Sequence, residues 1–300
     1  MNQTGFMLYS DRIRMMFPTY LLDSVNRVIP GPETPTANFN HIMSVLLSKD
    51  LSRNEEISWI EKERNRFLDK SVSMRNHGIA FCSYPRSGNT MLRVYLEQIT
   101  GITTGANDQL TGGALSLQIS GLKGEAHLTD HDTVWITKVH PIGMIIPTPP
   151  FTVTKQIYLI RNPIDMIVSE FLLYTAKTHS SQVSEDLKNN PGFKKWFDLA
   201  LPRIKVMQRN IMDNKDQGMP TLFLTYEMLI LEPEQTLTDI FRFFLGVPSL
   251  EGTVVEKRIK DVCAEGHEKK AIYELKTTKQ KENLSRNSHC YSDDDIAMIK

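Results

Sequence analysis

The stretch 84–90, with the sequence YPRSGNT, combines an arginine and a glycine with several hydroxyl and amide side chains. An apolar run at 78–84 precedes it, and a helical pattern at 88–100 follows it. Backbone N–H groups at the start of a helix bind anions, and an arginine adds a fixed charge with forked donors. The sequence therefore predicts an anion-binding loop made by Arg86, Ser87, Gly88, Asn89 and Thr90.

A nucleoside triphosphate is not the anion that this loop predicts, because a triphosphate loop needs the pattern G-x-x-x-x-G-K-[ST]. Ser83 stands at the position of the first glycine, and Asn89 stands at that of the lysine. The missing lysine argues against a triphosphatase. A plain tight turn before a capped helix remains an alternative interpretation of the loop.

A second strand-to-helix turn has the sequence QIYLIRNPIDMIVSEF. Its strand ends at Arg161, an Asn-Pro pair typical of a helix start follows, and Asp165 completes a box-like cap. Ser169 lies about two helical turns further on. In isolation, the simpler interpretation is that Arg161 pairs with an acidic neighbour and Ser169 is a packing residue. Two such turns in one chain favour a nucleotide that is phosphorylated at two places.

The run 133–141, with the sequence TVWITKVHP, ends with a lysine and a histidine two residues apart. Side chains at that spacing share one face of a strand. The pair predicts a general base, His140, with a positive charge beside it from Lys138. The neighbouring cation favours the neutral imidazole that a base requires. The alternative is a strand end whose polar side chains face water.

The chain has 300 residues, of which 40% are hydrophobic, with 35 basic and 35 acidic side chains. A net charge of zero argues against nucleic acid or a membrane surface as a partner. Three cysteines without metal spacing indicate reduced thiols, and the polar stretch at 127–132 lacks a second ligand group, so no metal site is predicted. The N-terminal segment shows neither a signal peptide nor a membrane span. We therefore expect a cytoplasmic protein.

The hydrophobic pattern predicts the elements that must position these residues. Strands are predicted at 78–84, 133–139, 155–160 and 221–226, and helices at 41–50, 54–72, 88–100, 163–176 and 233–246. Ser52 and Glu55 have the spacing of a capping box for the helix at 54–72. Strands that alternate with helices imply right-handed crossovers. The fold class is therefore α/β, with a central, mostly parallel sheet flanked by helices and a ligand at the carboxyl ends of its strands.

We expect the chain to divide into a helical extension at 1–77, packed on the core, and a catalytic domain at 78–300. Residues 103–125 are rich in Gly, Ser and Thr and are expected to form a mobile loop, whereas 256–300 is charged and irregular. The last residues have a helical pattern, which leaves open whether the chain is truncated at Lys300.

The order of the motifs resembles that of the sulfotransferases that use 3′-phosphoadenosine 5′-phosphosulfate (PAPS), closest to their cytosolic branch. The resemblance spans about residues 78–250. It is carried by YPRSGNT at 84–90, KVHP at 138–141, RNPIDMIVS at 161–169 and the run 226–246. It implies a P-loop-like sulfotransferase fold, PAPS as the donor, 3′,5′-bisphosphoadenosine (PAP) as a product, and no metal.

The resemblance also implies roles for individual residues. The loop at 86–90 would hold the 5′-phosphosulfate, Arg161 and Ser169 would grip the 3′-phosphate, and Tyr226 would lie near the adenine. The base would be His140. The catalytic set would be, in chain order, Arg86, Lys138 and His140.

This chain departs from the family at two places. Arg86 stands where cytosolic members usually carry a lysine, and the Arg-Lys-Gly run that clamps the 3′-phosphate is absent. Lys279, Lys281 and Arg286 are candidate substitutes for that clamp.

The acceptor is expected to be a small molecule with a hydroxyl group, or a sugar. Its pocket would be formed by 103–128, 141–151 and 174–195, whose apolar side chains include Met144, Ile145, Ile146, Phe151 and Tyr174. A non-catalytic protein that binds PAPS or PAP, and a nucleotide kinase, remain as alternatives. The oligomeric state is open, with a homodimer as one candidate.

Overall fold

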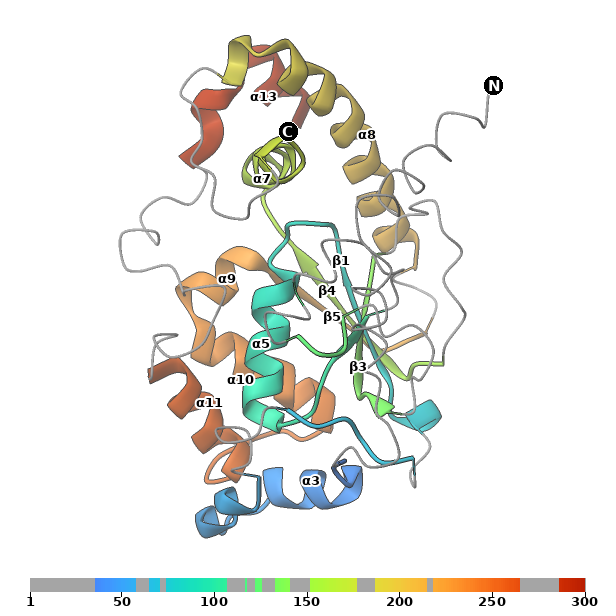
Figure 1. Ribbon diagram of the computed structural model, residues 1–300, viewed down its shortest axis with the longest axis vertical. Coiled ribbons are helices and arrows are strands. Elements are labelled where there is room, and N and C mark those ends of the chain that lie inside the picture. The colour runs from blue at the N-terminus through green and yellow to red at the C-terminus, as the bar shows by residue number, and fades with distance from the viewer. Residues whose placement is uncertain are drawn as a thin grey trace, which may run out of the picture.

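The computed structural model describes residues 36–57, 65–70, 74–106, 117, 122–125, 133–140, 152–176, 187–214, 218–264 and 286–299. At its centre is a five-stranded sheet in the order β2-β3-β1-β4-β5, and all four strand pairs are parallel. The strands are β1 (Ile79–Ser83), β2 (Gly105–Ala106), β3 (Ile136–Val139), β4 (Lys155–Ile160) and β5 (Thr221–Thr225). The predicted α/β fold class is thereby confirmed, and Figure 1 shows helices on both sides of the sheet.

The helices follow the strands as the sequence pattern predicts. The main ones are α3 (Phe39–Leu46), α5 (Asn89–Thr100), α7 (Pro163–Ala176), α8 (Pro191–Asn214), α9 (Tyr226–Leu231), α10 (Pro233–Leu245), α11 (Val254–Ala264) and α13 (Asp293–Ile299). Short 3-10 turns are η1 (Leu51–Ile57), η2 (Met74–Asn76), η4 (Leu187–Asn189) and η6 (Arg286–Cys290). None of the helices among the described residues is long and apolar enough to cross a membrane.

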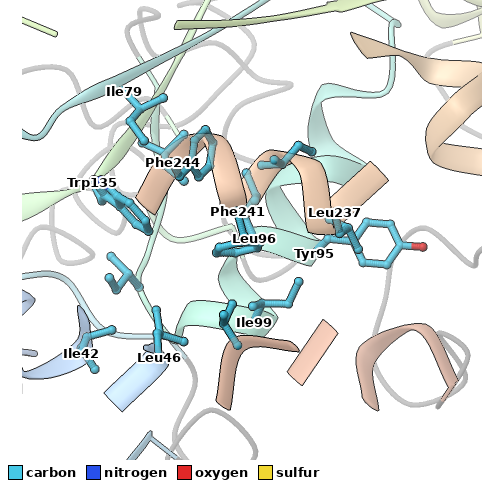
Figure 2. Packing of buried hydrophobic residues seen from close by; sticks show 14 of the residues in the cluster. Ile42, Leu46, Ile79, Tyr95, Leu96, Ile99, Trp135, Leu237, Phe241 and Phe244 are labelled. Carbon is cyan, nitrogen blue, oxygen red and sulfur yellow. The ribbon is translucent and has the colours of Figure 1, made fainter. Parts of the chain in front are cut away.

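Alternate residues of β1 enter two different hydrophobic clusters, because successive side chains of a strand point to opposite faces. Phe81 belongs to the cluster that contains α3, α5, α10 and α11, whereas Cys82 belongs to the one that contains α7 and α8. Both faces of the sheet are thus covered, as a parallel sheet requires. Figure 2 shows part of the first cluster, including Ile42, Leu46, Leu96, Ile99, Trp135, Phe241 and Phe244.

The register of the sheet brings the ends of its central strands to one edge. Cys82 of β1 is aligned with Val139 of β3 and with Tyr158 of β4. The segments that follow these three strands therefore emerge side by side. They carry the predicted anion-binding loop, the predicted base His140 and the strand-end Arg161.

The predicted helix at 54–72 is wrong in its described part. Residues 51–57 form the 3-10 turn η1, and 65–70 are extended, with parallel bridges from Arg66 to Ile102 and from Leu68 to Ala37. Phe67 and Leu68 are consecutive and both buried, which suits a segment that runs between two layers better than a helix with one buried face. The expected capping box is replaced by contacts with Asp50, which accepts from the backbone N–H of Ser52 at 3.1 Å and from its hydroxyl at 2.6 Å.

Helix α3 shares the main hydrophobic cluster with β1 and α5, so the described part of the extension is built into the core. The cause is its apolar face, in which Phe39, Ile42, Val45 and Leu46 are buried. Trp59 and Ile60, expected on the buried face of the 54–72 helix, lie outside the described residues.

Other differences lie in segments without a clear hydrophobic period. The loop predicted at 103–125 contains β2, whose two residues pair with Thr137 and Lys138 of β3. Helix α8 was not predicted, and α11 occupies the start of the region expected to be irregular. Helix α13 confirms the helical pattern at the end of the chain.

Candidate functional site

The predicted anion-binding loop turns sharply between β1 and α5. Arg86 has a φ of 68° and Gly88 has a φ of 94°, and α5 begins directly after this glycine at Asn89. A Cβ atom on Gly88 would lie 2.5 Å from Cδ2 of Tyr226, so the turn has no room for a side chain there. The loop therefore presents the first N–H groups of a twelve-residue helix at the carboxyl edge of the sheet.

Two side chains of the loop point back into the protein. The hydroxyl of Ser87, fully buried, donates to the thioether of Met166 at 3.2 Å. The amide of Asn89 donates from Nδ2 to the hydroxyl of Ser83 at 2.9 Å. These side-chain contacts fix the loop, together with the backbone N–H of Ser87, which donates to the carbonyl of Tyr84 at 3.2 Å. The Oδ1 atom of Asn89 is buried without a hydrogen-bond partner in the described part of the chain.

The two predicted anion sites are in direct contact. Nε of Arg86 donates to the hydroxyl of Ser169 on α7 at 3.0 Å, and Nη1 of Arg161 donates to the backbone oxygen of Arg86 at 2.8 Å. A guanidinium from each site therefore lies at the junction of β1, β4 and α7. This arrangement concentrates positive charge where three backbone segments end.

Arg161 is held by an aromatic ring as well as by the loop. Its guanidinium carbon lies 4.3 Å from the centre of the Tyr226 ring, and this ring also contacts Gly88. Burial lowers the pKa of Arg161, although a guanidinium stays charged at neutral pH. Its Nε atom is buried and has no hydrogen-bond partner among the described residues. A buried, unpaired donor of a charged group fits an anionic ligand.

The start of α7 differs in one detail from the predicted cap. The side chain of Asn162 accepts from the backbone of Ile164 at 3.0 Å, as expected. Asp165 does not complete a box with it, because the backbone N–H of Asn162 donates to Glu227. Instead, Oδ1 of Asp165 accepts from Nδ2 of Asn287 at 2.8 Å.

The contact between Asp165 and Asn287 ties the C-terminal segment to the start of α7, and the hydroxyl of Tyr291 adds a bond to the carbonyl of Ile164 at 2.7 Å. The backbone of Arg286 directly precedes Asn287 at the start of η6. One of the three candidate clamp residues thus lies in a segment that packs on α7. The other two, Lys279 and Lys281, lie outside the described residues.

His140 follows β3, and its Nδ1 lies 2.7 Å from the carbonyl oxygen of Ser83 at the end of β1. A carbonyl oxygen only accepts hydrogen bonds, so a neutral imidazole in this contact carries its proton on Nδ1. The lone pair is then on Nε2. The backbone beside the anion-binding loop thereby sets the tautomer that a general base needs.

Lys138 makes an ion pair that the sequence did not indicate. Its Nζ lies 2.5 Å from Oε1 of Glu125, whose other oxygen accepts from Nη1 of Arg93. Burial raises the pKa of Glu125, but attraction to Lys138 and Arg93 outweighs it and lowers the pKa to about 2. The signal was hidden because Glu125 lies in a Gly-rich stretch without periodicity.

The expected acceptor pocket is described only in part. Tyr174 at the end of α7 is 45% exposed, and its ring lies 4.7 Å from that of Trp196 on α8. The stretch 141–151, with four of the five apolar residues expected in the pocket, lies outside the described residues, as does 127–132. Among the described residues, no group of three or more His, Cys, Asp or Glu side chains is placed to hold a metal ion.

Comparisons with other proteins place this geometry in context. WSCD family members of Aedes aegypti and Drosophila melanogaster are each 29% identical to the chain, over 165 and 167 residues. These matches cover 55% of this chain and 49% of each relative, so the chain spans about half the length of the curated relatives it matches.

Among solved structures, mouse sulfotransferase SULT7A1 complexed with PAP is 20% identical, with a TM-score of 0.41 over 72% of this chain and 69% of that chain. Retinol dehydratase in complex with androsterone and PAP is 15% identical, with a TM-score of 0.41 over 90% of this chain and 86% of that chain. Structural similarity at this level does not assign a ligand to this chain.

The family comparison is more extensive. The model of the sulfotransferase domain family matches residues 78–294, which include the anion-binding loop, both strand ends and the C-terminal segment tied to α7. This match covers well over half of the chain. The resemblance found in the motifs is thus confirmed, and the chain belongs to the sulfotransferase family.

Proposed function

We propose that the protein transfers the sulfuryl group of PAPS to a hydroxyl group of a small molecule or sugar. The observation that carries the proposal is the contact of the two predicted anion sites through Arg86, which bonds Ser169 with its side chain and Arg161 with its backbone. A nucleotide with phosphate groups at both its 5′ and 3′ ends needs two such sites within one molecule's reach.

The residues present fit this donor. The unpaired Nε of Arg161 is a buried cationic donor that an anionic group would satisfy. We assign the 5′-phosphosulfate to the loop at 86–90 and the 3′-phosphate to Arg161 and Ser169. The adenine is assigned to the neighbourhood of Tyr226.

We assign the role of the absent Arg-Lys-Gly run, which is to clamp the 3′-phosphate, to the segment that begins at Arg286. Asn287 holds that segment against the start of α7. The segment would then close the 3′-phosphate side of the donor site. The roles of Lys279 and Lys281 in this clamp remain predictions from the sequence alone.

When bound, PAPS supplies an activated sulfuryl group: the acceptor oxygen bonds to sulfur as the bond from sulfur to the bridging oxygen breaks, and PAP leaves. His140 takes the acceptor's proton on Nε2, since Nδ1 is bonded to Ser83. Arg86, Lys138 and the N–H groups of the loop stabilise the negative charge that grows during transfer.

Release of PAP tests the proposal. The protein is incubated with PAPS and a panel of hydroxylated small molecules and sugars, with and without EDTA. We expect release of PAP with at least one acceptor in both conditions. His140→Ala should lower the rate by a factor of about 100 or more while PAP binding is retained. Transfer by this variant within a few-fold of wild type would mean that another group is the base.

The test also separates the two alternatives. Tight binding of PAP without transfer to any acceptor would favour a non-catalytic binding protein, and magnesium-dependent phosphoryl transfer from ATP without release of PAP would favour a nucleotide kinase. The cytoplasmic location, the absence of a metal and the oligomeric state remain predictions from the sequence.

A further inference from the structure

A buried cluster of charged side chains lies beside the proposed base. Glu125 is 2% exposed and contacts two cations at once, Lys138 through Oε1 and Arg93 through Oε2. Arg93 is fully buried and Lys138 is 7% exposed. The cluster joins helix α5, the segment 122–125 and strand β3, which are three separate parts of the chain.

Arg93 is itself held in one orientation. Its Nε donates to the hydroxyl of Thr104 at 2.7 Å, and its Nη2 donates to the carbonyl of the same residue at 3.1 Å. Thr104 in turn donates from its backbone to Oε1 of Glu97 at 2.8 Å. The guanidinium therefore has little freedom to move, and the carboxylate that it binds is fixed in place.

Among the described residues, the titratable groups placed near Lys138 include Glu125, Arg93 behind it, Glu97 beyond Arg93, and His140 on the same face of β3. Of these, Glu125 is the carboxylate in direct contact with the ammonium group. A buried ammonium group without a counter-ion tends to lose its proton. Glu125 is thus a counter-ion for the charge beside the base.

We propose that Glu125 is a positioning residue for sulfuryl transfer, which keeps Lys138 charged and directed toward the reacting groups beside His140, with Arg93 as its anchor. This inference rests on the proposed function. It also explains why the chain buries three charged side chains together, since apolar residues in their place would reduce the stability of the fold little.

The test compares Glu125→Gln with the wild-type protein from pH 6.5 to pH 9. The amide cannot neutralise the buried ammonium group, so the ratio of variant to wild-type kcat should decline as pH rises. We expect a loss of about tenfold or more at pH 9, with the KM for PAPS changed less than about threefold. The double variant with Lys138→Met should show no such decline, because the titrating group is gone.

Glu97→Gln is the matched control. Glu97 is also a buried carboxylate of the same network, and Asn65 and Thr104 bond to it instead of Lys138. Burial raises the pKa of Glu97, and the amide of glutamine keeps an oxygen that can accept from the backbone N–H of Thr104. This variant should keep the wild-type dependence of kcat on pH. Parallel pH profiles for Glu125→Gln and wild type would overturn the proposal.

Two further measurements keep the outcome clear. If Glu125→Gln does not fold, Glu125→Asp retains the charge but shortens the side chain, so it should keep the wild-type pH profile and lose kcat several-fold; an unchanged kcat would contradict positioning.

If the wild type binds PAP but transfers to no acceptor, the proposed function fails. NMR titration of labelled lysine, assigned with Lys138→Met, still decides whether Glu125 holds Lys138 charged: an unchanged pKa in Glu125→Gln would refute it.

Discussion

The guanidinium of Arg86 donates a hydrogen bond from Nε to the hydroxyl of Ser169 at 3.0 Å. One residue belongs to the loop after β1, and the other lies on α7, 83 residues further along the chain. Because Arg161 also bonds the backbone of Arg86, the loop is tied both to α7 and to the residue that follows β4.

Ser169→Ala tests the assignment of this hydroxyl to the 3′-phosphate. Loss of one hydrogen bond to a charged group costs about 1.5 kcal/mol, which corresponds to about tenfold weaker binding. Calorimetry should show this loss for PAP and little change for AMP, which lacks the 3′-phosphate. Thr175→Ala is the control, since its hydroxyl bonds Phe171 within the same helix. Equal weakening for PAP and AMP would contradict the assignment.

Arg161→Ala should weaken the binding of both PAPS and PAP by roughly 100-fold, or about 3 kcal/mol, because a buried charged donor is removed. The affinity for AMP should fall less. The contacts of Arg161 with Tyr226 and with the backbone of Arg86 are also lost, so the stability of the variant is measured alongside. Unchanged affinity for both nucleotides would refute the role of Arg161.

Gly88→Ala should damage the loop more than a comparable change elsewhere. The new Cβ would lie 2.5 Å from Tyr226, in addition to the strain of a positive φ. Gly252→Ala is the matched control, because its φ of 73° imposes the same strain with no atom within 4 Å of the new Cβ. Urea denaturation should show a loss of about 1 kcal/mol for the control and a larger loss for Gly88→Ala. Similar losses, with PAP binding intact in both, would argue against a tight loop.

Glu170 makes the stability of the fold depend on pH. Burial raises the pKa of its carboxyl group to about 7, and Oε2 accepts a hydrogen bond from the hydroxyl of Tyr84 at 3.2 Å. A carboxyl group with a raised pKa favours the folded state while it is protonated. Its contribution is complete below its ordinary pKa near 4.5 and is lost as the pH rises through about 7.

Glu170→Gln should therefore be more stable than wild type at pH 8.5, by about 3 kcal/mol, and close to wild type at pH 4.5. The amide still accepts from Tyr84 but cannot ionise. Urea denaturation at the two pH values measures the difference. A constant offset between the two proteins at both pH values would show that Glu170 does not titrate in this range.

The chemistry-bearing residues at the strand ends could be predicted because the hydrophobic patterns of strands and helices repeat over only a few residues. An apolar run that stops at Arg161, or a lysine and histidine two residues apart at 138 and 140, needs no knowledge of the rest of the chain. The rule that parallel sheets bind ligands at their carboxyl edge then brought these residues together. The extended segment at 65–70 was missed because charged residues surround its few apolar positions and imitate a helix.

The sequence alone determined the fold class, the family and the residue types of the anion-binding loop. Tertiary structure decided which partners these residues have: Ser83 for His140, Ser169 for Arg86, Glu125 for Lys138 and Asn287 for Asp165. Periodicity is local, whereas each of these contacts depends on the register between strands or on how a distant segment packs. Whether a charged side chain is an exposed end or a buried ion pair is fixed only when those segments meet.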